Sequence, residues 1–153
     1  MAEKVLFRAA VTAVVTLAAI ATAPVAMAAG TGDTGEVSVQ AISCDSSGWL
    51  PGGDPRERCT SLGNGVLAHS KRRNSDLNTT VLRTSYYKRE GTAISAQLGR
   101  NYNGSTVYAA ATTISSGATV SKSWSVSGDK TCLNSVGLLK YSGGSYQTPV
   151  AHC

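Results

Sequence analysis

Few residues of the chain could perform catalysis together. Two histidines, His69 and His152, are present and lie far apart in sequence. No Gly-x-Ser-x-Gly turn, which exposes the nucleophilic serine of many hydrolases, occurs in the chain. We therefore expect both histidines to have structural or surface roles and the protein not to be an enzyme. The aspartates that could otherwise complete a Ser-His-Asp arrangement are Asp45, Asp54, Asp76 and Asp129.

Other reactive constellations are equally poorly supported. Nearly all acidic residues stand beside turn residues or beside Lys and Arg, so a glycosidase-type carboxylate pair has no support. The glycines of Pro51-Gly52-Gly53 precede no Gly-Lys-Ser, which argues against a phosphate-binding loop. No CxxC occurs, and zinc sites usually require such spacing. We expect neither a cofactor nor a metal.

The four cysteines predict two disulfides. An oxidising environment favours paired cysteines, and pairing leaves no thiol for catalysis. Sequence alone permits three pairings. We favour Cys44–Cys59 and Cys132–Cys153, because each closes a short loop and the second ties the last residue to the domain. A loop of this size removes roughly 3 kcal/mol of unfolded-state entropy.

The segment CDSSGWLPGGDPRERC, residues 44–59, has two interpretations. A disulfide-closed loop is preorganised for binding; Trp49 and Leu50 could anchor an interface, with Arg56 and Arg58 as charged neighbours. Either arginine could then enter the pocket of a trypsin-like protease. Alternatively, Trp49 folds back over one end of the core and the glycines and prolines form turns. We favour this second interpretation.

The first 28 residues read as a secretory signal peptide. Lys4 and Arg8 precede an apolar run that ends in Ala26-Met27-Ala28, a small-x-small cleavage site. A membrane anchor is the alternative, opposed by Pro24 and by the weakly apolar Ala and Thr. No later stretch approaches the roughly 20 apolar residues of a spanning helix. We expect a secreted, extracellular protein with an extended segment over residues 29–43 and one β domain over residues 44–153.

The charge of the chain is mildly basic. Of its 14 Lys and Arg and 9 Asp and Glu, Lys4, Arg8 and Glu3 fall in the predicted signal, which leaves 12 basic and 8 acidic residues. Lys71-Arg72-Arg73 is the single basic run. This surplus favours adhesion to anionic cell surfaces and only weakly indicates nucleic acid, which we do not expect as a partner.

Turn dipeptides divide the chain after Thr79 into segments of about twelve residues. Short, evenly spaced strands with such punctuation predict an all-β fold, a compact antiparallel β-sandwich or barrel with two disulfides and a flexible N-terminal strand. The dipeptides are Glu90-Gly91, Asn103-Gly104, Ser116-Gly117, Gly128-Asp129 and Gly143-Gly144.

Alternation identifies the clearest strands. In residues 118–129, serines occupy one face, while Val120, Trp124 and Val126 share the other with Lys122. Residues 92–99 alternate similarly. Residues 105–114 are ambiguous and could form a central strand covered on both faces. Helix has little support, although a short helix within residues 62–73 is an alternative.

The segment before Cys44 contains a loose Gly-rich stretch and then one alternating strand, residues 36–42. This strand could pair with the domain's own sheet. It could instead leave the domain and add itself to a partner's sheet edge, where main-chain hydrogen bonds supply affinity and alternate side chains supply specificity. The residues that would bind a partner in this way are Glu36, Val37, Ser38, Val39, Gln40, Ala41 and Ile42.

Two families resemble parts of this pattern. Secreted actinobacterial subtilisin inhibitors are similar in size, with a strand leading into a Cys-closed Gly/Pro loop, but the resemblance stops at Cys59, because LNSVGLLKY follows Cys132 instead of their reactive-site stretch. The Ala/Thr-rich signal, Gly-rich leader, alternating strand and four-cysteine β domain together resemble the small adaptor subunit of actinobacterial umbrella toxin particles. That resemblance implies an adaptor that joins a lectin-like subunit to a toxin-bearing subunit through an inserted N-terminal strand, here residues 36–42.

We therefore predict a secreted, non-enzymatic adaptor that binds other secreted proteins through its N-terminal strand, as a component of an extracellular antibacterial toxin complex. The alternatives are a protease inhibitor that presents residues 49–58 and a module that binds cell-wall glycan. Exposed tyrosines could stack on sugar rings in the last case. The candidates are Tyr86, Tyr87, Tyr102, Tyr108, Tyr141 and Tyr146.

Overall fold

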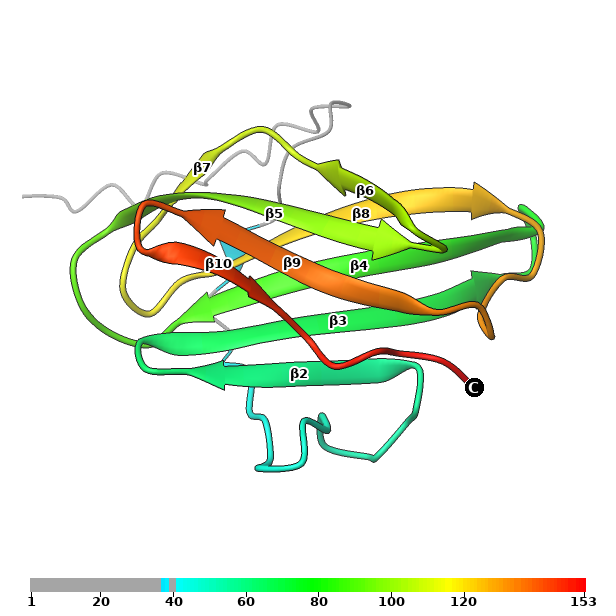
Figure 1. Ribbon diagram of the computed structural model, residues 1–153, viewed down its shortest axis with the longest axis horizontal. Helices are drawn as coiled ribbons and strands as arrows, with labels where there is room; N and C mark the ends of the chain where they lie inside the picture. The colour runs from blue at the N-terminus through cyan, green and yellow to red at the C-terminus, as the bar shows by residue number, and fades with distance from the viewer. Residues whose placement is uncertain (1–36, 39–40) are drawn as a thin grey trace, which may run out of the picture. The chain divides into compact units, whose positions relative to one another are not determined.

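A computed structural model describes residues 37–38 and 41–153 of the chain (Figure 1). These residues belong to one compact unit, Asp33–Cys153. The predicted signal peptide and the whole Gly-rich stretch lie outside the described residues. Within the described part of the chain every regular element is a β-strand, which confirms the predicted all-β class.

The strands form two antiparallel sheets. The first has the order β1-β8-β4-β3-β2, and the second has the order β10-β9-β5-β6, with β7 pairing with β5 (Figure 1). The strands of the first sheet are β1 (Val37–Ser38), β2 (Glu57–Leu62), β3 (Gly65–Asn74), β4 (Thr79–Lys88) and β8 (Thr119–Ser127). Those of the second are β5 (Ile94–Tyr102), β6 (Ser105–Tyr108), β7 (Thr112–Ile114), β9 (Ser135–Tyr141) and β10 (Gly144–Gln147).

The core lies between the two sheets. Strands β3 and β4 of the first sheet contact β9, and β4 and β8 contact β5, so the sheets stack face to face as a sandwich. Gly137 permits a close approach of the sheets, because a Cβ atom at this position would lie 2.7 Å from the His69 Cβ. The buried cluster consists of Leu67, Tyr86, Ala96, Leu98, Ile114, Val120 and Leu139.

The predicted turn at Asn103-Gly104 is confirmed. Asn103 and Gly104 connect β5 to β6, and both have positive φ, 46° and 81°. A two-residue hairpin with positive φ at both positions follows the right-handed twist of its strands, and Asn-Gly suits it best. Tyr102 therefore pairs directly with Ser105 across the turn.

Two sequence interpretations of single segments are wrong. The alternative of a helix within residues 62–73 fails because β3 runs through this segment; its residues Val66–His69 are all buried, since both faces of β3 are covered there. A continuous apolar run of this length does not separate a doubly covered strand from a buried helix. Residues 105–114 are also not one central strand. They divide into β6 and β7, and all four residues of β6 are exposed.

Candidate functional site

The N-terminal strand meets the domain at one edge of the first sheet. Val37 pairs with Val120 and Ser38 with Thr119, antiparallel. Glu36, Val39 and Gln40 of the predicted strand lie outside the described residues. The final two residues of the predicted strand differ in environment: Ala41 is exposed, and Ile42 is half-buried on the outer face of the sheet.

Ile42 belongs to a small second cluster on the outer face of the first sheet. There Cys59, Val66 and Ala68 are buried, and Ile42, Cys44 and Leu50 pack against them. The first disulfide, Cys44–Cys59, ties this covering segment to β2. The Cys44–Cys59 segment, which we call the strap, thus covers part of the outer face of the first sheet through Leu50. The sequence had instead suggested that Trp49 folds over one end of the core.

Contacts inside this segment hold its tryptophan and its charged side chains in place. The Asp45 carboxylate accepts hydrogen bonds from the backbone N–H groups of Ser47 and Trp49, at 2.9 and 2.8 Å. Trp49 forms a β-bridge with Arg58, whose guanidinium lies 3.7 Å from the centre of the indole ring. Arg58 also donates to the Ser47 carbonyl at 3.1 Å. Trp49 and Arg58 therefore stabilise each other within the strap.

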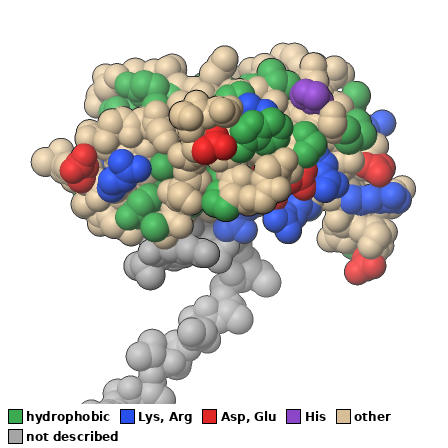
Figure 2. Space-filling view, turned by 90° about the horizontal axis from the view of Figure 1, so that it is seen from below, with side chains coloured by type: hydrophobic (Ala, Val, Ile, Leu, Met, Phe, Trp, Pro, Cys, Tyr) green, Lys and Arg blue, Asp and Glu red, His purple; other side chains and the backbone are tan. Residues whose placement is uncertain are grey.

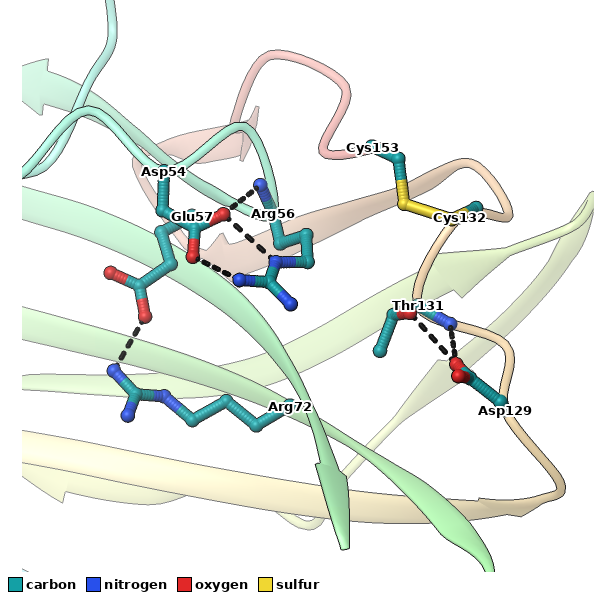
Figure 3. Close-up of polar contacts among 8 residues, drawn as sticks. All are labelled: Asp54, Arg56, Glu57, Arg72, Asp129, Thr131, Cys132 and Cys153. Carbon is teal, nitrogen blue, oxygen red and sulfur yellow. Dashed lines mark hydrogen bonds and ion pairs between the residues drawn. A yellow bond between two sulfur atoms is a disulfide. The ribbon is translucent and has the colours of Figure 1, made fainter. Parts of the chain in front are cut away.

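Arg56 is held by its neighbour in the same turn (Figure 3). Its Nε and Nη2 donate to the two oxygens of Asp54 at 2.9 and 2.7 Å, and its backbone N–H donates to Asp54 as well. These bonds lower the pKa of the Asp54 carboxyl to about 2. Both arginines that an inhibitor would present are thus engaged internally, which favours the strap over a reactive-site loop.

The second disulfide, Cys132–Cys153, joins the C-terminus to the segment before β9 (Figure 3). Lys71 secures the same end from inside: its Nζ donates to the carbonyl of Leu133 at 2.5 Å and to that of Ala151 at 2.8 Å. Desolvation lowers the pKa of this buried ammonium to about 8. Both predicted disulfides are confirmed. The sequence did not predict that Lys71 is buried.

A chain of hydrogen bonds links the two sheets through His69. The Thr84 hydroxyl donates to the Gly99 carbonyl at 2.9 Å, so its oxygen accepts from His69 Nδ1 at 3.0 Å. His69 Nε2 is then an acceptor, and the Ser135 hydroxyl donates to it at 2.9 Å. Neutral imidazole with its proton on Nδ1 therefore satisfies every member of the chain.

Ser135 and His69 are hydrogen-bonded as a nucleophile and its general base would be, but their environment does not suit catalysis. His69 is 1% exposed and Ser135 is 2% exposed, so both are closed off from solvent. Burial, with the nearby charges of Lys71 and Arg100, lowers the pKa of His69 to about 3, which makes the imidazole a weak base. The third member is Thr84, which is not a carboxylate. The arrangement suits a structural role, while His152 is exposed at the C-terminus.

No group of residues in the described ranges gathers the three His, Cys, Asp or Glu side chains that could hold a metal ion. The ion pairs instead join single acids to single arginines, Arg72 to Glu57 at 2.6 Å and Arg73 to Asp129 at 3.3 Å.

Figure 2 shows Lys and Arg side chains gathered at one end of the drawn face, interspersed with Asp and Glu. Such a mixed surface lacks the single-sign field typical of nucleic-acid binding.

The six tyrosines have different environments. Tyr86 is buried in the core, and Tyr141 and Tyr146 stack on each other with ring centroids 5.8 Å apart. Tyr87 and Tyr102 are half-buried, and Tyr108 on β6 is exposed. Stacking on a sugar needs an exposed ring, and Tyr108, at 36% exposed, is the candidate among the six that meets this condition.

The edge of the first sheet extends beyond β1. Past Val120, β8 pairs with β4 on one side, and on its other side no described strand lies against Ser121–Ser127. Ser123, Ser125 and Ser127 on its outer face are exposed, as predicted. Thr119 and Ser121 on the same face are buried. They line a hollow of about 430 Å³ that residues 41–43 also line. Among the described residues, β8 therefore pairs with β1 at one end and with no strand along the rest of that side.

Comparisons with protein-family models, with curated proteins and with solved structures found no match for this chain. The assignment of function therefore depends on the site itself. Among the residues that the structure describes, no helix is long and apolar enough to cross a membrane. The two disulfides are typical of an oxidising, extracellular environment.

Proposed function

We propose that the protein is a secreted, non-enzymatic adaptor that binds other proteins and engages one partner through the N-terminal strand, residues 36–42. The observation that supports this most is the way in which Val37–Ser38 is attached. Two residue pairs at the end of β8 hold these residues. Each hydrogen bond contributes about 1 kcal/mol net, so exchange of this pairing for a longer one on a partner's edge costs little.

The position of the segment also suits donation to a partner. Cys44 fixes the chain to β2 through the disulfide, only six residues after Ser38. The domain is therefore anchored directly behind the strand that would be donated. Strand addition requires little shape complementarity from the rest of the domain, because main-chain hydrogen bonds provide most of the affinity.

The finer role, as a component of an extracellular antibacterial toxin complex, is part of the same proposal. It depends on the resemblance to the adaptor subunit of umbrella toxin particles and on the predicted signal peptide. An adaptor of that kind needs no catalytic group, which agrees with the burial of the Ser135–His69 pair.

The test is recovery of partners from culture supernatant by affinity purification and mass spectrometry. We expect the intact chain to recover a reproducible secreted partner, and a variant that lacks residues 29–40 to lose it. A matched pair of double variants tests the strand itself. V37K with V39K charges the apolar row and should abolish capture, whereas S38K with Q40K charges the polar row and should retain it. Recovery of the same partner by the truncated variant would contradict the proposal.

A further inference from the structure

Strand β8 forms one border of the sandwich. In the first sheet it lies beyond β4, and in the second sheet β6 lies beyond β5. Because β8 contacts β5 across the core, β8 and β6 flank the same side of the sandwich (Figure 1). The backbone of Ser121–Ser127 faces this side, and no strand of the described ranges covers it. Such a row of N–H and C=O groups is a template for another strand.

The side chains along this border are partly apolar. Val120 is in the core, so by alternation Lys122, Trp124 and Val126 point to the same face, and each is half-buried. On the facing sheet, Val107 of β6 is 37% exposed; it lies opposite Arg100, which shares a face of β5 with the core residue Leu98. A strand added to β8 would bury its inward side chains beside these residues, and its outward side chains would lie beside serines.

The sequence of residues 30–36 does not suit this edge. If the register of Val37 with Val120 continued backward, Gly35 would lie opposite Lys122, Asp33 opposite Trp124 and Thr31 opposite Val126. None of these residues is apolar. Three glycines within residues 30–36 weaken a strand further, because Gly has low β propensity.

Lys122 makes the edge selective. An inward-pointing charge on an edge strand opposes addition of an arbitrary apolar strand, because its ammonium would lose water without gaining a partner. A strand that carries a carboxylate at the facing position removes this cost. The same residue that discourages unspecific pairing thus defines the chemistry of a specific partner.

We infer that the edge of β8 at Ser121–Ser127 accepts an extended strand from a second partner protein, which places a carboxylate opposite Lys122 and apolar side chains opposite Trp124 and Val126. The inference rests on the proposed function and deepens it. An adaptor needs two contact surfaces, and the domain then donates one strand and receives another at the same sheet.

The test uses two synthetic peptides and the full chain. In the first peptide, Thr alternates with Val over nine residues and one Val is replaced by Glu; the second has Lys at the Glu position. Amide hydrogen exchange followed by NMR should show that alternate amides of residues 121–127 gain protection with the Glu peptide. We expect the Lys peptide to bind about tenfold more weakly, because its charge faces Lys122.

Charge reversal of the protein provides the matched control. Lys122→Glu should invert the preference between the two peptides. Lys140→Glu makes the same change on β9, which is paired with β5 and β10 on both sides, and should leave the preference unchanged. Should Lys122→Glu fail to fold, the comparison of the two peptides on the unaltered chain still decides the matter.

Three outcomes would overturn the inference: equal affinity for the two peptides, protection at β6 instead of β8, or protection in the free chain of those amides of residues 121–127 that do not bond to β4. The chain that lacks residues 29–40 separates the two proposals. If it binds the Glu peptide and still recovers the secreted partner, the proposed function fails and this inference stands. If the partner depends on residues 29–40 and no peptide binds, the inference alone fails.

Discussion

At the scale of single residues, the buried polar groups stabilise the sandwich without reacting. His69, Thr84 and Ser135 form a continuous series of hydrogen bonds that ends on the Gly99 carbonyl, so each of these three side chains has a hydrogen-bond partner. Burial keeps the imidazole neutral, because the charged form would lose its hydration, and the charges of Lys71 and Arg100 act in the same direction. The stability of the protein should therefore respond to the protonation of this one residue.

Acidification should destabilise the fold between pH 6.5 and pH 3. The folded-state pKa of His69, about 3, lies below its ordinary value of 6.5, so in this range the unfolded chain binds a proton that the folded chain does not. The stability present above pH 6.5 is lost as the pH falls. Between pH 6.5 and pH 4.5 we expect the free energy of unfolding to drop by roughly 2 to 3 kcal/mol. Urea unfolding at a series of pH values measures this drop.

The control for this prediction is His69→Gln, which keeps a donor and an acceptor but does not titrate. Its free energy of unfolding should vary little between pH 6.5 and pH 4.5. The low pKa of Asp54, about 2, acts in a different window, because its contribution is lost only as the pH falls below its ordinary value of 3.8. An equal acid response of the parent chain and the variant would show that His69 is not responsible.

At the scale of elements, the Cys44–Cys59 segment acts as a strap. Leu50 packs against Cys59, Val66 and Ala68 on a sheet face that would otherwise meet water. Truncation of a half-buried leucine costs less than truncation in the main core. We expect Leu50→Ala to lower the free energy of unfolding by about 1 to 2 kcal/mol, as measured by urea denaturation.

Leu77 provides the comparison for the strap. It is 70% exposed in the turn between β3 and β4, so Leu77→Ala removes the same atoms without uncovering a buried cluster. Its effect on stability should stay within about 0.5 kcal/mol. If both variants lost the same stability, Leu50 would not cover the sheet, and the segment would be better described as a presented loop.

At the scale of the whole molecule, the sequence predicted the features that residues close in sequence determine, such as turns and short disulfide loops. Asn103-Gly104 specified its hairpin, and short loop closures suggested both disulfides. The sequence did not predict features that depend on burial by segments distant in sequence. A short helix within residues 62–73 stayed open as an alternative, because both faces of β3 are covered and its apolar residues do not alternate with polar ones. Lys71 gave no signal that its ammonium would meet two backbone carbonyls distant in sequence. The open side of β8 depends on strand order, which alternation within one strand does not contain.

The same strand order creates a hazard that Lys122 should control. A sheet with an open edge and a donated strand can pair with further copies of itself, and an inward charge on the edge opposes this. Lys122→Val replaces that charge with an apolar side chain beside Trp124 and Val126, so we expect concentration-dependent self-association in sedimentation experiments. Lys140→Val removes the same charge from a strand paired on both sides and should leave the oligomeric state unchanged. If the Lys122→Val and Lys140→Val proteins had the same oligomeric state at every concentration, the edge of β8 would not be available to another strand.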